Sequence, residues 1–391
     1  STNMITGAAT ATICRIPVLL FPSDYYASRY GGTVLQDIDH LTSDDMSVTD
    51  TFRVVSRFYD RITRPEQILT ALPEAMRVLT NPAETGAVTI ALPQDIQGYA
   101  YDYPTSFFEK RIWRIERQMP HPDRIREAIE LLINAKKPYI IAGGGIHYSE
   151  AWTELLEFSE RFGIPVGETH AGRGAIQNGS ELLMGGTGHL GTPCAGKIAE
   201  ESDLVLCIGT RLHDFVTGSN SAFQNPEVKF ISVNVNSRDA HKLGALPITS
   251  DARLALSALI ECGKDMGLEA NSSWLTTIKA ERKNWEEIKE TQVFIERSGE
   301  KISQGHLIGI LNEEMKDGDT LLAAAGTIPS DLTKLFDTRG GKKVHIEFGN
   351  SCMGYDIPAA IGVRLAGTED EIYVLMGDGN YQMHPLSLIH I

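Results

Sequence analysis

Short apolar runs alternate with longer helix-like stretches along the whole chain. Seven of these runs are expected to form buried strands: Pro17–Phe21, Ala87–Leu92, Pro138–Ala142, Asp203–Ile208, Lys229–Val235, Thr320–Ala325 and Glu371–Met376. Four of the runs end directly in glycine, at Gly143, Gly209, Gly326 and Gly377. An apolar strand followed by a glycine turn and a helix is typical of parallel α/β units, in which ligands bind at the carboxyl ends of the strands.

Two changes in composition suggest domain boundaries. The segment Tyr99–Pro122 is rich in aromatic, basic and proline residues, which predicts a linker, and Asn271–Lys301 is charged and helical in pattern. We therefore predict an α/β fold with three doubly wound parallel-sheet domains, the first and last incomplete. The predicted segments are 1–105, 120–265, a helical linker at 271–300, 301–385, and a non-native tail at 386–391.

The outer two segments are small for the fold they suggest. Each contains too few clear strands to close a doubly wound sheet. The chain also begins with Ser1 rather than methionine. We expect both outer domains to be truncated, one at its beginning and the other at its end.

Composition narrows the range of functions. The 391 residues are 42% hydrophobic and 22% charged, and no apolar stretch approaches the roughly 20 residues of a membrane helix. The net charge of −15 argues against nucleic acid as a partner, although a metal ion could still hold a diphosphate locally. The five cysteines form no C-x-x-C pair, so we expect reduced thiols in a cytoplasmic protein.

The strongest chemical motif is the Gly377-Asp378-Gly379-Asn380 segment at the end of a predicted strand. Glycine lets the backbone approach a ligand closely, and an aspartate carboxylate suits Mg²⁺, which often keeps phosphate oxygens as partners. The alternative is a plain Asp-Gly turn, since motifs this short also occur by chance.

The preceding sequence favours the functional interpretation. A predicted strand ends at Gly326-Thr327, and Met353-Gly354 opens a stretch with Pro358-Ala359-Ala360 that precedes Asp378 by about 25 residues. In this order the motifs resemble the diphosphate-binding domain of thiamine-diphosphate enzymes of the acetolactate synthase type.

This resemblance implies thiamine diphosphate and Mg²⁺ as cofactors. Asp378 would bind the metal, Met353 would be the apolar wedge that bends the cofactor, and Ser351 would offer a backbone carbonyl to its pyrimidine. The bend would make proton removal from the thiazolium carbon intramolecular. The implied cofactor-binding residues are Gly326, Thr327, Ser351, Cys352, Met353, Gly354, Gly377, Asp378, Gly379 and Asn380.

Other segments resemble one branch of this family, which hydrolyses a ring C–C bond of a polyhydroxylated cyclic dione in inositol catabolism. The similar segments are Val55–Gln67, Tyr99–Asp102, Phe107–Arg111, Gly326–Leu332 and His345–Tyr355. The alternatives are a lyase similar to acetolactate synthase or glyoxylate carboligase, and a non-catalytic fragment.

The resemblance also implies residues outside the given sequence. The family's catalytic glutamate precedes the region where this chain starts, and a second metal-binding asparagine follows the region where it ends. We therefore expect no catalytic residue in the chain as given, and no activity from it alone. In the family the active site forms between subunits, which implies a homo-oligomer.

The last six residues do not fit the family pattern. Leu386–Ile391 is the translation of CTG-TCT-CTT-ATA-CAC-ATC, which resembles a transposon-end adapter. We expect a non-native tail here, and the alternative is the start of an apolar helix.

The central segment contains fewer signals of chemistry. Its Gly143-Gly144-Gly145 run does not match G-x-G-x-x-G, so a dinucleotide such as FAD has little support. We expect its histidines to be loop or structural residues rather than metal ligands, because no metal-binding spacing links them. These histidines are His147, His170, His189 and His213. The side chain of Arg173 could face substrate or solvent.

Overall fold

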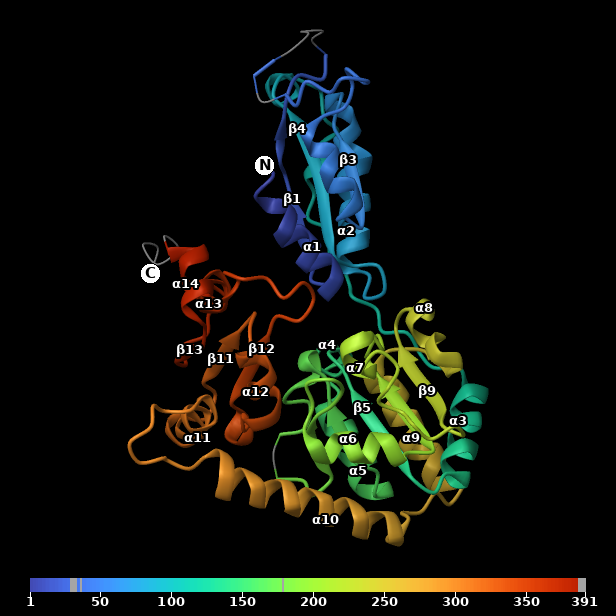
Figure 1. Cartoon of the computed structure of the whole chain (residues 1–391). Coiled ribbons are helices and arrows are strands. Elements are labelled where there is room, and N and C mark those ends of the chain that lie inside the picture. Colours follow the sequence, from blue (N-terminus) through green and yellow to red (C-terminus); the bar gives the residue numbers. More distant parts are fainter. Residues whose placement is uncertain (29–33, 36, 178, 386–391) are drawn as a thin grey trace. The chain divides into compact units, whose positions relative to one another are not determined.

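The computed structural model describes residues 1–28, 34–35, 37–177 and 179–385 and divides the chain into two compact units. The first unit is Ser1–Glu116 and the second is Arg117–Ile391. Their boundary falls inside the predicted linker Tyr99–Pro122. Every strand pair in the described part of the chain is parallel, and helices connect the strands, which confirms the α/β class (Figure 1).

The sheet of the first unit is built around β4 (Ala87–Pro93). Strands β1 (Val18–Leu20) and β3 (Phe58–Arg61) pair with β4 on its two sides, and β2 (Ser23–Asp24) pairs with its last residues. β4 is buried along nearly its whole length, as expected for an inner parallel strand. The apolar pattern does not predict β3, because two of its four residues, Asp60 and Arg61, are charged.

Two α-helices accompany this sheet, α1 (Met4–Cys14) and α2 (Ile68–Thr80). α2 buries Ala71, Ala75 and Val78 in a core that also contains Val88 and Ile90 of β4. The shorter helical turns of the unit are η1 (Val48–Val54), η2 (Pro65–Gln67), η3 (Ile96–Gly98) and η4 (Thr105–Phe108).

The second unit contains a six-stranded sheet in the order β10-β9-β8-β5-β6-β7. Its strands are β5 (Pro138–Ala142), β6 (Val166–Glu168), β7 (Leu183–Gly186), β8 (Leu204–Ile208), β9 (Lys229–Asn234) and β10 (Leu246–Thr249). β5, β8 and β9 lie where the apolar runs predict them. β6, β7 and β10 are short, and the pattern does not identify them.

Helices cover both faces of this sheet. They are α3 (Pro122–Asn134), α4 (Gly145–Ser149), α5 (Trp152–Phe162), α6 (Pro193–Glu201), α7 (Asp214–Thr217), α8 (Ser237–Ala240) and α9 (Ala252–Asp265), with turns η5 (His170–Gly172) and η6 (Lys242–Gly244). Ile140 of β5 packs with α3, α5 and α9, while its neighbours Tyr139 and Ile141 pack on the other side with α6. This alternation follows the period of two residues in a strand.

The charged segment after α9 is helical, as predicted. It forms α10 (Ser272–Ile288), which continues into one π-helical turn, η7 (Lys289–Val293). Trp274 and Ile278 of α10 belong to the same core as Tyr139 and Ile141 of β5. The helix is therefore packed on the central sheet and is not a free connection.

A three-stranded sheet in the order β12-β11-β13 follows. Its strands are β11 (Thr320–Ala323), β12 (Lys343–Ile346) and β13 (Ile372–Val374), and its helices are α11 (Gln304–Glu314), α12 (Ile328–Leu335), α13 (Asp356–Leu365) and α14 (Asp378–Met383), with the turn η8 (Arg339–Gly341). β11 and β13 coincide with the last two predicted apolar runs. The predicted tail Leu386–Ile391 lies outside the described residues.

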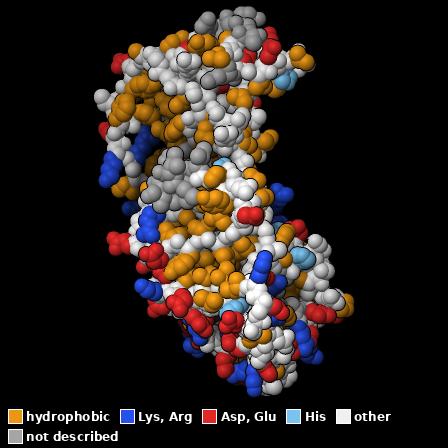
Figure 2. Space-filling view, turned by 60° about the vertical axis from the view of Figure 1, so that its left-hand side comes forward, with side chains coloured by type: hydrophobic (Ala, Val, Ile, Leu, Met, Phe, Trp, Pro, Cys, Tyr) orange, Lys and Arg blue, Asp and Glu red, His pale blue; other side chains and the backbone are white. Residues whose placement is uncertain are grey.

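Apolar side chains are also exposed on the surface, where Figure 2 draws them in orange. Among the described residues of the last sheet and its helices, Met353, Leu365 and Met383 are exposed. No helix in the described part of the chain is both long and apolar enough to cross a membrane. None of the five cysteines, all of which lie among the described residues, forms a disulfide.

Candidate functional site

The three predicted cofactor segments follow three strands of the same sheet. β11 pairs in parallel with both neighbours, with Ala323 opposite Ile346 of β12 and Leu322 opposite Val374 of β13. Because the strands are parallel and in close register, the segments that follow them leave from one edge of the sheet. The structure therefore places Gly326, the Ser351–Met353 segment and Asp378 at the carboxyl edge where α/β sheets bind ligands.

Open space surrounds the glycines of this edge. Gly326 has φ +101°, a conformation that favours glycine, and a Cβ added there would meet no atom within 4 Å. A Cβ on Gly377 would likewise meet no atom within 4 Å, and one on Gly379 would meet only Cε of Met353, at 3.3 Å. A bulky ligand group such as a diphosphate can therefore approach the backbone here. Thr327, which follows Gly326, is the residue before α12.

Met353 projects to the surface next to this open space. Its side chain is 48% exposed, so the alternative of ordinary core packing does not apply. The contact of its Cε with the position of Gly379 brings together two residues that the motif analysis assigned to one cofactor. An exposed thioether beside open backbone fits the predicted role of an apolar wedge.

The loop that carries Met353 is held by a buried carboxylate that the motif analysis does not identify. Glu347 is 2% exposed, and its two oxygens accept hydrogen bonds from the backbone N–H groups of Asn350, at 2.9 Å, and Cys352, at 2.7 Å. Ser351 lies between them with φ +51°, and Gly354 has φ +85°. The signal in the sequence is an acidic residue directly after β12, but that strand is itself half polar, so no apolar run marks it.

Asp378 is exposed and begins α14, with Oδ1 accepting a hydrogen bond from the N–H of Gly379 at 2.9 Å. The carboxylate is thus accessible to a cation. No group of three or more His, Cys, Asp and Glu side chains among the described residues could hold a metal ion. Mg²⁺ bound with a phosphorylated cofactor needs only one or two protein carboxylates, because phosphate and water supply the other oxygens.

Asn380 points into the protein. Its side chain is buried, and Nδ2 donates hydrogen bonds to the carbonyl oxygen of Ala325 and to Oδ2 of Asp356, both at 3.2 Å. The predicted lining role of Asn380 can therefore involve its backbone, whereas its amide connects the segments after β11 and β13 to α13.

Asp356 is the second buried carboxyl group that motif analysis does not identify. It is 1% exposed, and its Oδ1 has no hydrogen-bond partner among the described residues. Burial raises the pKa of Asp356, with a smaller contribution from the negative charge of Glu347. Two acidic side chains, Glu347 and Asp356, thus lie beneath the loop that carries Met353.

Arg173 does not face solvent, which excludes one of the two possibilities raised by its position in the sequence. It is buried, and its guanidinium forms an ion pair with Glu168, which is fully buried at the end of β6. Arg173 also donates a hydrogen bond of 2.6 Å to the carbonyl oxygen of Phe336, the residue after α12. Its role is to connect the central sheet to the last one.

His147 has structural contacts. Its Nε2 lies 3.1 Å from the carbonyl oxygen of Arg173, and its Nδ1 accepts a hydrogen bond of 3.0 Å from Nε1 of Trp152. Burial lowers the pKa of His147. The ring therefore connects α4 and the first residue of α5 to the segment after η5.

The glycine run after β5 is explained by packing. A Cβ on Gly143 would lie 2.4 Å from the carbonyl oxygen of Gly209, and one on Gly145 would lie 2.5 Å from Cα of Gly209. The turns after β5 and β8 therefore contact each other directly, which only glycine permits. This contact leaves no space between them for a phosphate group.

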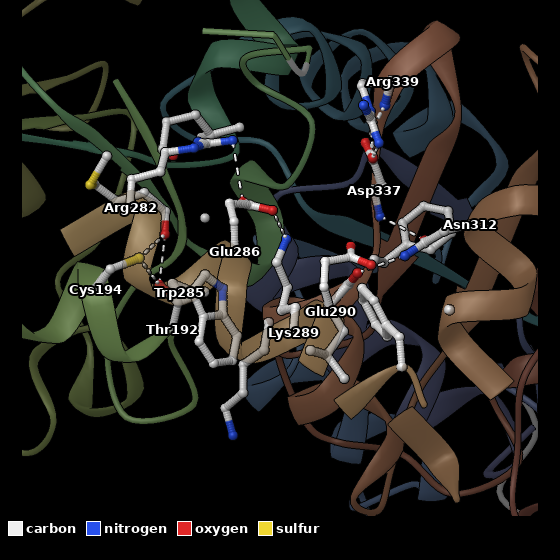
Figure 3. A pocket seen from close by; sticks show the side chains of 18 of the residues that line it. Thr192, Cys194, Arg282, Trp285, Glu286, Lys289, Glu290, Asn312, Asp337 and Arg339 are labelled. Atoms are coloured by element: carbon white, nitrogen blue, oxygen red, sulfur yellow. Dashed lines mark hydrogen bonds and ion pairs between the residues drawn. The ribbon is translucent and has the colours of Figure 1, made fainter. Parts of the chain in front are cut away.

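A polar pocket of about 520 Å³ lies elsewhere in the second unit, between β7, α10, α11 and the end of α12 (Figure 3). Its charged side chains largely neutralise one another: Lys289 pairs with Glu286 at 2.7 Å, and Arg339 pairs with Asp337. None of the predicted cofactor-binding residues lines it. The pocket is thus separate from the carboxyl edge of the last sheet, and the open glycines make that edge the better candidate site.

Comparison with known proteins agrees with this assignment. Residues 125–259 match the model of the thiamine pyrophosphate enzyme central domain, and residues 324–391 match that of the C-terminal TPP binding domain. The second match includes the segments of all the predicted cofactor residues.

Curated relatives resemble nearly the whole chain. It is 43% identical, over 98% of its length, to "3D-(3,5/4)-trihydroxycyclohexane-1,2-dione hydrolase 2" of one Bacillus cereus strain and to a protein of the same name, without the number, from a second strain of that species. A protein of that name from Bacillus thuringiensis (strain Al Hakam) is 42% identical over the same share. The chain spans 63% of the length of each. The predicted resemblance is confirmed, and the chain belongs to the thiamine pyrophosphate enzyme family.

Proposed function

We propose that the protein takes part in the thiamine-diphosphate-dependent hydrolysis of a ring C–C bond in 3D-(3,5/4)-trihydroxycyclohexane-1,2-dione, giving 5-deoxy-glucuronate in inositol catabolism. The observation that carries this proposal is the 43% identity over 98% of the chain to relatives named for hydrolysis of that dione. The open carboxyl edge of the last sheet supports it, because its exposed carboxylate and open glycines fit a magnesium diphosphate.

The residues of this edge would divide the binding task. Asp378 would ligate Mg²⁺ through its exposed carboxylate, and the open backbone at Gly326 and Gly377 would admit the diphosphate. Met353 would support the cofactor in its bent form, while the backbone carbonyl of Ser351 would accept a hydrogen bond from the pyrimidine amino group. Glu347 keeps this loop in place before any ligand binds, which lowers the ordering cost of binding.

When bound, thiamine diphosphate supplies a nucleophilic carbon and an electron sink for cleavage of a C–C bond next to a carbonyl. The protein residues described above position the cofactor and take no part in making or breaking bonds. The cleavage adds water across the bond, so that one ring carbonyl carbon becomes a carboxylate and its former neighbour gains a proton. Met353 also excludes water from one side of the site through its apolar side chain.

The reaction can be tested directly with the purified protein at the full length of its relatives, of which the chain spans 63%, together with thiamine diphosphate and Mg²⁺. Loss of the cyclic dione and formation of 5-deoxy-glucuronate should both depend on the two cofactors. Parallel assays with pyruvate and glyoxylate test the alternative of a lyase similar to acetolactate synthase or glyoxylate carboligase. Turnover of pyruvate or glyoxylate without turnover of the dione would refute the proposed substrate.

We also propose that the protein is cytoplasmic and acts as a homo-oligomer of at least two chains. Five cysteines without a disulfide among them support a reducing compartment. The family resemblance supports active sites shared between subunits, and exposed apolar side chains such as Leu365 and Met383 could be covered by assembly. Light scattering of the purified protein would test the assembly, and a monomeric mass under assay conditions would refute it.

A further inference from the structure

Three histidines of the central sheet surround one exposed phenylalanine. His170 follows β6, His189 follows β7, and His213 precedes Phe215 in the segment after β8. The ring centroids of the three histidines lie 6.3, 6.0 and 6.5 Å from the centroid of Phe215, in that order. Phe215 is 45% exposed, so its ring is available to a ligand. We call these four residues the histidine cluster.

The cluster is held together by the backbone. The N–H of His189 donates a hydrogen bond of 2.7 Å to the carbonyl oxygen of Phe215. Gly188 makes this approach possible, since a Cβ at its position would lie 2.2 Å from the same oxygen and its φ is +91°. The loops after β7 and β8 are therefore fixed against each other, and the rings they carry are preorganised.

The imidazoles of the two less exposed histidines are neutral near pH 7. Burial, with smaller contributions from His213 and Arg173, lowers the pKa of His170 to about 4. Burial and the positive charge of Arg211 lower the pKa of His213. A neutral imidazole offers one donor and one acceptor, which matches a hydroxyl group. Nε2 of His170 is buried without a hydrogen-bond partner among the described residues.

The cluster adjoins the loop assigned to the cofactor. The ring of His213 stacks on that of Phe348, with centroids 6.3 Å apart and planes within 8°. The guanidinium of Arg211 lies 6.0 Å from the same ring. Phe348 directly follows Glu347, whose carboxylate holds the backbone of the Ser351–Met353 loop. The cluster and the predicted cofactor loop are thus joined through the consecutive residues Glu347 and Phe348.

The chemistry of the cluster selects among ligand classes. A metal held by side chains alone is disfavoured, because the described residues contain no group of three or more His, Cys, Asp and Glu that could hold one. A strongly anionic ligand is disfavoured by the neutral imidazoles and by the exposed carboxylate of Asp214 beside His213, at 3.5 Å. An exposed aromatic face with nearby donors and acceptors suits a ring that carries C–H groups on its face and hydroxyls at its edge.

We propose that the histidine cluster binds the hydroxylated ring of the substrate, with Phe215 against the ring face and His170, His189 and His213 at the hydroxyl groups. This inference rests on the proposed function, which places a polyhydroxylated ring on the neighbouring cofactor. It assigns substrate recognition to the central domain. The cofactor motifs do not say what part this domain plays in the reaction.

Two exposed members of the cluster allow a test without risk to the fold. Phe215→Leu and His189→Ala should each raise the KM for the dione at least tenfold. The affinity for thiamine diphosphate, measured by calorimetry, should stay within twofold of the wild type. Phe215→Tyr, which retains the aromatic face, should keep the KM for the dione close to the wild-type value. Phe108→Leu is the matched control, since Phe108 is an exposed aromatic residue of the first unit.

Direct binding separates this proposal from the proposed function. Saturation-transfer NMR with myo-inositol, an unreactive hydroxylated ring, should give a signal with the wild type that Phe215→Leu removes. If that signal is absent, or is equal in the variant, the cluster does not bind the ring, whatever the enzyme turns over. If the signal behaves as expected while the dione is not hydrolysed, the proposed reaction is wrong and ring recognition stands. An unchanged KM in both variants, with normal wild-type turnover, would also overturn the proposal.

Discussion

Asn380 donates a hydrogen bond from Nδ2 to Oδ2 of the buried Asp356 at 3.2 Å. The same Nδ2 donates to the carbonyl oxygen of Ala325, also at 3.2 Å. One side-chain amide therefore joins the segments after β11 and β13 to the first residue of α13, which follows the loop of Met353. All the segments of the candidate cofactor site are linked to one another before a ligand binds.

Removing this link should weaken cofactor binding. Asp356→Ala leaves Nδ2 of Asn380 with one acceptor and loosens α13, so we expect the affinity for thiamine diphosphate to fall about tenfold, or about 1.4 kcal/mol. Asp356→Asn keeps an acceptor oxygen and should retain most of the affinity. Titration calorimetry with Mg²⁺ present measures both variants. Equal affinity in wild type and Asp356→Ala would show that the link does not organise the site.

The buried ion pair of the central sheet makes a prediction for stability. Arg173→Met leaves Glu168 buried without its partner, and the free energy of unfolding should fall by about 3–5 kcal/mol. The double variant Glu168→Gln/Arg173→Met should recover a large part of this loss. Urea denaturation measures both.

An exposed pair provides the control for that experiment. Arg124 and Glu127 form an ion pair at 2.6 Å, with side chains that are 47% and 46% exposed. Arg124→Met should change the free energy of unfolding by less than about 1 kcal/mol. A loss of that small size in Arg173→Met as well would contradict the structural role of the buried pair.

The close contact of the two glycine turns can be tested in the same way. Gly143→Ala places a Cβ 2.4 Å from the carbonyl oxygen of Gly209, so we expect destabilisation of at least about 1–3 kcal/mol. Gly196→Ala is the matched control, because Gly196 lies within α6 and a Cβ there meets nothing within 4 Å. That variant should be stabilised by roughly 0.5–1 kcal/mol, the helix propensity difference. Thermal unfolding that ranks the two variants in the reverse order would refute the packing explanation.

The half-buried His170 predicts a loss of stability in mild acid. Its pKa is lowered from 6.5 to about 4, so between these values the unfolded chain binds a proton that the folded chain does not. Stability contributed by the neutral ring is therefore complete above pH 6.5 and is lost as the pH falls towards 4, by at most about 3 kcal/mol. His170→Gln should reduce the difference in unfolding free energy between about pH 7 and pH 5. The exposed His121 gives the control His121→Gln, and an equal effect of both variants would contradict the assignment.

Apolar pattern and glycine spacing suffice to predict the α/β class and the strands β1, β4, β5, β8, β9, β11 and β13. They fail for β3, where Asp60 and Arg61 interrupt the apolar run, and for strands as short as β6 and β10. The motifs placed Gly326, Met353 and Asp378 correctly at one edge, because consecutive strands of a parallel sheet end together. They could not identify Glu347 or Asp356, since the sequence does not distinguish a buried acidic residue from an exposed one before its hydrogen-bond partners are known.

The central histidines illustrate the same limit. His170 and His213 are more than 40 residues apart in the sequence, and neither has a spacing that suggests a shared site. They meet because β6 and β8 both pair with β5, so the segments that follow them leave from one edge of the sheet. Only the strand order, which the sequence does not encode as a local pattern, reveals the cluster.

The metal role of Asp378 provides the most direct test of the cofactor site. Asp378→Ala removes the exposed carboxylate that we expect to hold Mg²⁺, and it leaves the diphosphate in a protein of net charge −15 without its counterion. Binding of thiamine diphosphate should then be lost or reduced at least a hundredfold, and Mg²⁺ should no longer enhance what remains. Calorimetric titration with and without Mg²⁺ measures both effects. Glu369→Ala, another exposed acid in the same unit, should bind like the wild type, which excludes a general effect of charge. If Asp378→Ala keeps its affinity and its dependence on Mg²⁺, Asp378 belongs to a plain Asp-Gly turn and the metal lies elsewhere.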